Sequence, residues 1–80
     1  MSLSLIEVRR LAVNVAEEED TGYEVLGTAR GGTGYAEVVV AEPGKGDRGR
    51  FVIGLNREAD ERTARDVVRT GLREHAEDRG

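Results

Sequence analysis

The only histidine of the chain, His75, is the side chain best suited to acid–base chemistry near neutral pH. It has no good nucleophile to activate, because the chain has no cysteine and its two serines, Ser2 and Ser4, lie close to the N-terminus. Zinc takes several histidine or cysteine ligands, which this chain does not supply. We therefore expect no catalytic site, no metal site and no cofactor. His75 is interpreted as a packed or helix-terminal histidine, with a ligand or a general base as the alternative.

The acidic run of residues 17–20 is the second group that could do chemistry, because Ca²⁺ and Mg²⁺ bind carboxylate oxygens. Its acids are consecutive and lack the alternate spacing of an EF-hand loop, so we interpret the run as a solvated turn or a helix end. The glycine-rich stretches 31–34 and 44–46 are interpreted as hairpin turns. A phosphate-binding glycine loop runs into a helix N-terminus, whereas the first stretch precedes a β-branched run and the second lacks a Ser or Thr after its lysine.

Basic side chains form two groups that could contact a partner. Residues 43–57 combine four cations with one acid, Asp47, for a net charge of +3; the cations are Lys45, Arg48, Arg50 and Arg57. Four more arginines fall at helical spacing within an arc of about 80°: Arg62, Arg65, Arg69 and Arg73. This stripe could meet phosphates, an acidic protein or the acidic run of a second copy. The alternative is a solvated ladder of i,i+4 ion pairs such as Glu61–Arg65, each stabilising the helix by about 0.2–0.5 kcal/mol.

The elements that position these side chains are clearest in the second half of the chain. Apolar residues at helical spacing predict a helix over residues 57–77, with Asn56 as its N-cap. Three β-branched runs, 23–30, 35–42 and 50–55, predict antiparallel strands, since the loops between them are too short for parallel crossovers. Phe51, Ile53 and Leu55 are expected on the strand face that meets the helix.

Residues 3–20 are compatible with two structures. As a helix they begin with a capping box, Ser4 to Glu7, and carry an apolar stripe from Leu5 to Ala16. Against a helix stands the acidic run at its C-terminal end, where the helix dipole disfavours negative charge. As a strand, Leu11, Val13 and Val15 would alternate with smaller or polar residues. The choice decides between an α-β-β-β-α order and a four-stranded meander with one helix.

On the helical reading, the order α-β-β-β-α resembles that of double-stranded-RNA-binding domains and of the N-terminal domain of bacterial ribosomal protein S5. The stretch 50–56, Arg-Phe-Val-Ile-Gly-Leu-Asn, leading into a helix, is similar to the strand-to-helix transition of the latter. The resemblance implies RNA binding by basic residues at the start of the last helix. Here only Arg57 matches that position, and Glu58, Asp60 and Glu61 follow it.

Length and charge complete the prediction. Eighty residues, 35% of them charged, with a net charge of −4, fit one small α+β domain over residues 1–80: a three- or four-stranded antiparallel meander with a C-terminal helix on one face. The net charge disfavours nonspecific nucleic-acid and membrane binding. No apolar run is long enough to span a membrane and no secretory signal is visible, so we expect a cytoplasmic protein.

The function expected from these features is that of a small non-catalytic protein-interaction or regulatory module, either a homodimer or an accessory subunit. Ile6 and Val13 lie off the main apolar stripe of residues 4–19, one heptad apart, and are the candidate dimer contacts. The alternative is RNA binding through Lys45, Arg48, Arg50 and Arg57.

Overall fold

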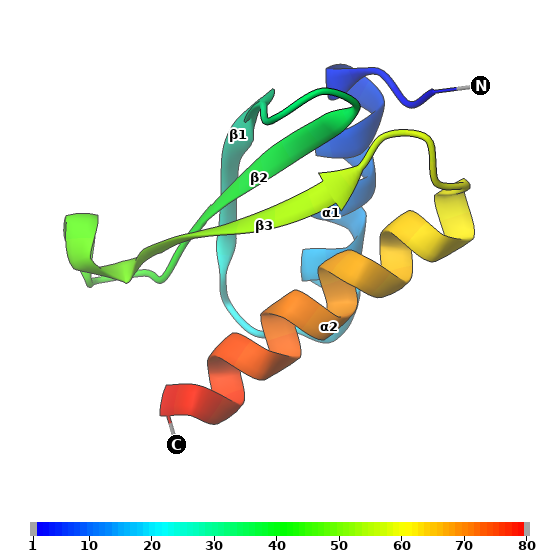
Figure 1. Cartoon of the computed structure of the whole chain (residues 1–80). Coiled ribbons are helices and arrows are strands. Elements are labelled where there is room, and N and C mark those ends of the chain that lie inside the picture. The colour runs from blue at the N-terminus through cyan, green and yellow to red at the C-terminus, as the bar shows by residue number, and fades with distance from the viewer. Residues whose placement is uncertain (1, 80) are drawn as a thin grey trace.

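A computed structural model describes residues 2–79 of the chain, with side-chain surroundings through Glu77. Helix α1 (Leu5–Glu19) precedes a three-stranded antiparallel sheet and helix α2 (Glu61–Arg79) follows it (Figure 1). The strands are β1 (Glu24–Arg30), β2 (Tyr35–Ala41) and β3 (Arg50–Asn56), in the spatial order β1-β2-β3. The α-β-β-β-α order is thus confirmed, and the four-stranded alternative is wrong. Within residues 2–79, no helix combines the length and the apolar character needed to cross a membrane.

Helix α1 begins with the predicted capping box. The Glu7 amide donates to the Ser4 hydroxyl, and the Ser4 amide donates to the Glu7 carboxylate, both at 3.1 Å. These bonds satisfy two backbone donors that the first turn leaves unpaired, which is why the helix starts here. The predicted apolar stripe is buried; it consists of Val8, Leu11, Ala12, Val15 and Ala16.

The two hairpins place the strands almost as predicted. Strand β2 pairs with β3 in a register that sets Val38 opposite Ile53. Alternate residues of β2 are buried and the residues between them are not, so one sheet face is covered and the other is open. The connection from β2 to β3 contains a one-turn 3-10 helix, η1 (Gly46–Gly49), which the interpretation of this segment as a hairpin turn did not include.

Helix α2 begins at Glu61, four residues later than predicted. The Asn56 side chain accepts a hydrogen bond from the Glu58 amide at 2.9 Å and forms a local turn instead of an N-cap. Asp60 takes the capping role, because its carboxylate accepts from the Thr63 amide at 2.7 Å. The Thr63 amide bond lowers the pKa of Asp60, since it favours the charged form.

A single apolar core lies between the covered sheet face and both helices. It joins the α1 stripe to buried residues of β2 and β3 and to Ala64, Val68 and Leu72 of α2. Gly71 lets α2 approach β3 closely: a Cβ at this position would lie 2.9 Å from Ile53 Cδ1. The lack of a side chain at Gly71 therefore sets the distance between helix and strand.

Candidate functional site

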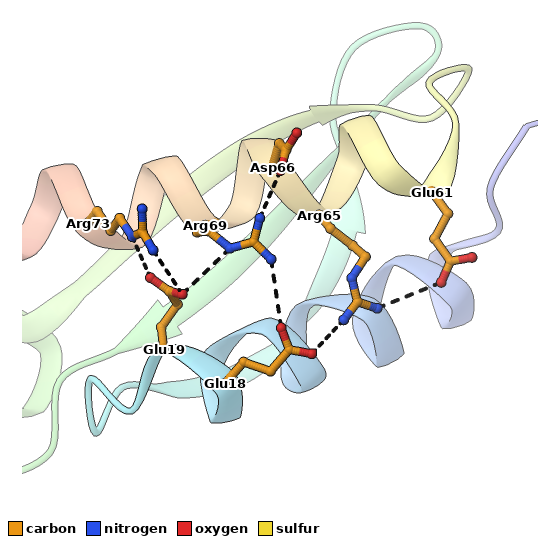
Figure 2. Close-up of polar contacts among 7 residues, drawn as sticks. All are labelled: Glu18, Glu19, Glu61, Arg65, Asp66, Arg69 and Arg73. Atoms are coloured by element: carbon orange, nitrogen blue, oxygen red, sulfur yellow. Dashed lines mark hydrogen bonds and ion pairs between the residues drawn. The ribbon is translucent and has the colours of Figure 1, made fainter.

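The arginine stripe of α2 is bound by acids of the same chain. Arg65 Nη2 lies 2.6 Å from Glu18 Oε1, and Arg73 Nε lies 2.6 Å from Glu19 Oε1 (Figure 2). Arg69 stands between them, 3.5 Å from the Glu19 carboxylate. The cations of one helix thus meet the acids of the other along their shared side. The acidic run 17–20 is accordingly the end of a helix, and Glu18 and Glu19 of this run pair with arginines of the same chain.

This pairing partly buries two of the four arginines of the stripe, whereas Arg73 remains 63% exposed. The side chains of Arg65 and Arg69 are only 27% and 28% exposed, whereas the solvated-ladder interpretation expected them in water. One predicted pair within the helix, Glu61–Arg65, is present at 3.8 Å. Arg62 lies outside the network in Figure 2 and is exposed. The stripe therefore holds α2 against α1 more than it offers a surface to a partner.

The interhelical pairs make stability depend on pH through Glu19. The hydrogen bond from Arg73, together with the charges of Arg73 and Arg69, lowers the pKa of the Glu19 carboxyl below its ordinary value of 4.5. A group whose pKa is lowered by folding stabilises the folded state above its unfolded pKa, and this stabilisation is lost as the pH falls through the folded pKa.

We therefore expect Glu19→Gln to lower the free energy of unfolding at pH 7, and we expect the difference from wild type to shrink steadily below about pH 4.5. Urea denaturation from pH 7 to pH 3 measures this difference. Glu17→Gln, at an exposed position two residues before Glu19 on α1, serves as the matched control. A difference in the free energy of unfolding between wild type and Glu19→Gln that stays constant down to pH 3 would contradict the stabilising role of the ionised Glu19 carboxylate.

The second basic group does not form one surface. Lys45 and Arg48 are exposed on the β2–β3 connection, and Arg50 pairs with Asp47 at 3.5 Å. Arg57 lies beyond the other end of β3, about 23 Å from Arg50 at the rise of an extended strand. Its Nε donates to the Leu3 carbonyl at 2.8 Å, so it anchors the N-terminal segment. Lys45, Arg48 and Arg50 thus lie near one end of β3, and Arg57 lies at the other.

His75 takes part in a packed cluster. Its ring stacks on Phe51 with centroids 3.7 Å apart, and the Tyr23 ring meets the Phe51 ring edge-on. The His75 Nε2 atom lies 2.8 Å from Oε1 of Glu42, whose side chain is only 6% exposed. The interpretation of His75 as a packed histidine agrees with this geometry. The sequence did not predict the burial of the Glu42 carboxylate, because Glu42 directly follows strand β2 and acidic residues at such positions are ordinarily exposed.

A groove of about 620 Å³ opens between β3 and the side of α2 that faces away from α1. Phe51, Val52 and Ile53 form its strand side. Val67 and Gly71 form the apolar part of its helix side, with the acids Asp66 and Glu74 on its border. The Val52 side chain is 53% exposed and Val67 is 36% exposed. The groove is a candidate contact surface that the sequence patterns do not indicate.

Strand β3 is an edge strand of the sheet formed by the described residues, and alternate peptide groups of this strand point away from β2. The Glu42 amide donates to the Gly49 carbonyl at 3.0 Å, and the Arg57 amide donates to the Gly34 carbonyl at 2.8 Å. Both bonds share the register of the β2–β3 ladder, in which hydrogen-bonded pairs alternate, so the odd-numbered residues of β3 bond to β2. The peptide groups of Val52 and Gly54 therefore point to the free edge of the sheet.

The two candidate dimer residues lie in different surroundings. Ile6 is 72% exposed near the start of α1. Val13 is half-buried beside a smaller groove between α1 and β1. Among residues 2–79, no group of three or more His, Cys, Asp or Glu side chains could hold a metal ion.

Comparison with known proteins finds no matching family model, no matching curated protein and no matching solved structure.

Proposed function

We propose that this protein is a small non-catalytic protein-interaction module whose contact surface is the groove between β3 and α2. The observation that carries the proposal is the free edge of β3, where the peptide groups of Val52 and Gly54 point outward beside an apolar groove. An edge strand of this kind is a template for another extended segment. Main-chain hydrogen bonds then supply affinity and the groove supplies specificity.

Two further features support the proposal. The Val67 side chain borders the groove and is 36% exposed, so a bound segment would bury apolar surface that folding leaves in water. The ion pairs between α1 and α2 hold the groove side of α2 in place before a partner arrives. A pre-formed site binds more tightly than one that must be ordered on binding.

The proposal is tested by selecting a display library of random linear peptides on the immobilised protein in three forms: wild type, Val52→Pro and Val52→Thr. Proline removes the outward amide but is tolerated in edge strands, whereas threonine keeps the amide and the β-branched shape. Circular dichroism establishes that each form is folded. We expect the selected peptides to bind wild type and Val52→Thr alike, and Val52→Pro at least about tenfold more weakly. Failure to enrich any peptide, or equal binding to all three forms, would overturn the proposal.

Self-association through α1 is a second candidate, favoured by the exposure of Ile6. Light scattering on a size-exclusion column would then give a mass near twice 8.7 kDa. Ile6→Asp should return the mass to that of a monomer, while Asn14→Asp, an exposed position on the same helix, should not. A wild-type monomer removes this candidate, and a dimer that dissociates only in Val52→Pro assigns the second copy to the β3 edge.

A further inference from the structure

We infer that the groove takes an extended basic segment of a partner protein, in which two Lys or Arg residues four positions apart flank an apolar residue. This inference rests on the proposed function and adds the chemistry of the partner. It follows from the register between β3 and α2 and from the charges that border the groove.

Two contacts define how the strand and the helix run alongside each other. At one end the Phe51 ring stacks on His75. Two residues further along β3, Ile53 meets α2 at Gly71, which lies four residues before His75. Two strand residues span about 6.6 Å and four helix residues span about 6 Å. Strand β3 and helix α2 therefore run in opposite directions with nearly equal rise over these residues (Figure 1).

The acids of the groove match this spacing. Glu74 lies beside the Phe51 end, and Asp66 lies eight residues, or about 12 Å, toward the other end. The Oδ1 atom of Asp66 already accepts a hydrogen bond from Arg69 Nη1 at 2.8 Å (Figure 2), and the side chain is 65% exposed, so a partner cation would share this carboxylate with Arg69. In an extended segment, residues four apart are separated by about 13 Å and point to the same side. A strand added to β3 with cations at such positions would therefore place one near each carboxylate.

The residue midway between the two cations would lie over the apolar part of the groove. Midway between Asp66 and Glu74 the helix presents Thr70 and Gly71, with Ile53 of the strand beside Gly71, and Val67 lies toward the Asp66 end. An aliphatic side chain there would lie over Gly71 and extend toward Val67, which is 36% exposed. The resulting pattern in the partner is Lys or Arg, any residue, an aliphatic residue, any residue, and Lys or Arg.

A second copy of the chain fits the groove less well than a basic segment. Strand β3 itself carries a single cation, Arg50, and this side chain lies on the open face of the sheet, away from α2. Pairing the β3 strands of two copies would also bring the Asp66 and Glu74 carboxylates of both copies to the interface between them. Like charges across an interface disfavour association, whereas opposite charges steer and orient it.

The inference is tested with three fluorescein-labelled peptides of nine residues. The central five residues are Lys-Thr-Val-Thr-Lys in the lysine peptide and Glu-Thr-Val-Thr-Glu in the glutamate peptide. The third, N-methylated peptide has the lysine sequence with N-methylated peptide bonds at alternate residues. Fluorescence anisotropy measures binding to wild type, Glu74→Lys and Glu17→Lys at low salt. We expect the lysine peptide to bind wild type and Glu17→Lys alike, and Glu74→Lys about fivefold more weakly or worse. The N-methylated peptide should lose binding to every form. The glutamate peptide should bind Glu74→Lys better than wild type.

Amide shifts in ¹H–¹⁵N NMR spectra should locate the bound lysine peptide at Val52, Gly54 and Val67. Equal binding of lysine and glutamate peptides to wild type, or an unchanged affinity in Glu74→Lys, would overturn the inference. The proposed function would survive that result if library selection still yields peptides that fail on Val52→Pro. Binding by neither kind of peptide, together with a dimer that Val52→Pro dissociates, would identify the occupant as a second copy.

Discussion

Replacing Leu72 with alanine is expected to lower the free energy of unfolding by about 3 to 5 kcal/mol. The Leu72 side chain is fully buried in the apolar core that joins both helices to the sheet. Removing it forfeits the transfer free energy of three heavy atoms and leaves a cavity that the closely packed surroundings fill only in part. A small domain has only about 5 to 15 kcal/mol of stability, so this loss removes a large fraction of the total.

Urea denaturation followed by far-UV circular dichroism measures the loss. Val67→Ala, on the same helix at a position that is 36% exposed, provides the control, and its free energy of unfolding should change by less than about 1 kcal/mol. A Leu72→Ala protein as stable as Val67→Ala would mean that α2 is not packed on the sheet as described.

Replacing His75 with phenylalanine is expected to lower the free energy of unfolding by about 1.5 to 3 kcal/mol, which is the contribution of a hydrogen bond to a charged group. Phenylalanine keeps the ring that stacks on Phe51, so the change isolates the contact with Glu42. The Glu42 carboxylate is only 6% exposed and has the His75 Nε2 atom at 2.8 Å. Without the imidazole it keeps its burial but loses that partner.

The double variant His75→Phe with Glu42→Leu tests the cause of the loss. Replacing a buried polar pair by apolar residues of similar volume is often neutral or stabilising, so the double variant should recover to within about 1 kcal/mol of wild type. Thermal and urea denaturation of wild type, His75→Phe, Glu42→Leu and the double variant complete the double-mutant cycle. A His75→Phe protein as stable as wild type would contradict the importance of this contact, as would a double variant less stable than the single one.

The arrangement of α2 connects stability to the proposed function. Its side toward α1 is occupied by arginines that bind Glu18 and Glu19 (Figure 2). The adjacent side of the helix, which carries Leu72, packs in the core. The remaining side, with Val67 and Glu74, borders the free edge of β3. Variants of the groove residues should therefore change binding with little effect on folding, whereas variants of Glu19 or Leu72 should change folding first.

Local patterns in the sequence were sufficient for most of the secondary structure. The alternating runs between glycine-rich turns placed all three strands to within a residue or two, because hairpins depend on neighbouring residues and on turns that need positive φ, such as Gly34. The apolar spacing of Ala64, Val68 and Leu72 identified the buried side of α2. Its first residue was misplaced because Asn56 and Asp60 are both acceptable N-caps, and only the hydrogen bonds distinguish them.

Residues 3–20 show where local reasoning stops. The helix dipole disfavours acids at the C-terminal end of a helix, and this argument counted against a helix when residues 3–20 were considered alone. In the folded chain, Arg65, Arg69 and Arg73 come from a helix more than forty residues away and neutralise Glu18 and Glu19. The same contact explains why the arginines are not a free stripe. Neither group reveals its partner, because the pairing depends on how the two helices pack.

The sequence by itself determined the three strands, the C-terminal helix and the apolar side of that helix, since these follow from periodicity and turn chemistry within short windows, but it left residues 3–20 as a helix or a strand. Only the tertiary structure decided the partners of the charged residues, the burial of Glu42 beside His75 and the position of the groove. Each of these depends on residues distant in sequence meeting at one place. The groove in particular exists because Gly71 brings α2 close to β3 while no further strand covers that edge among residues 2–79.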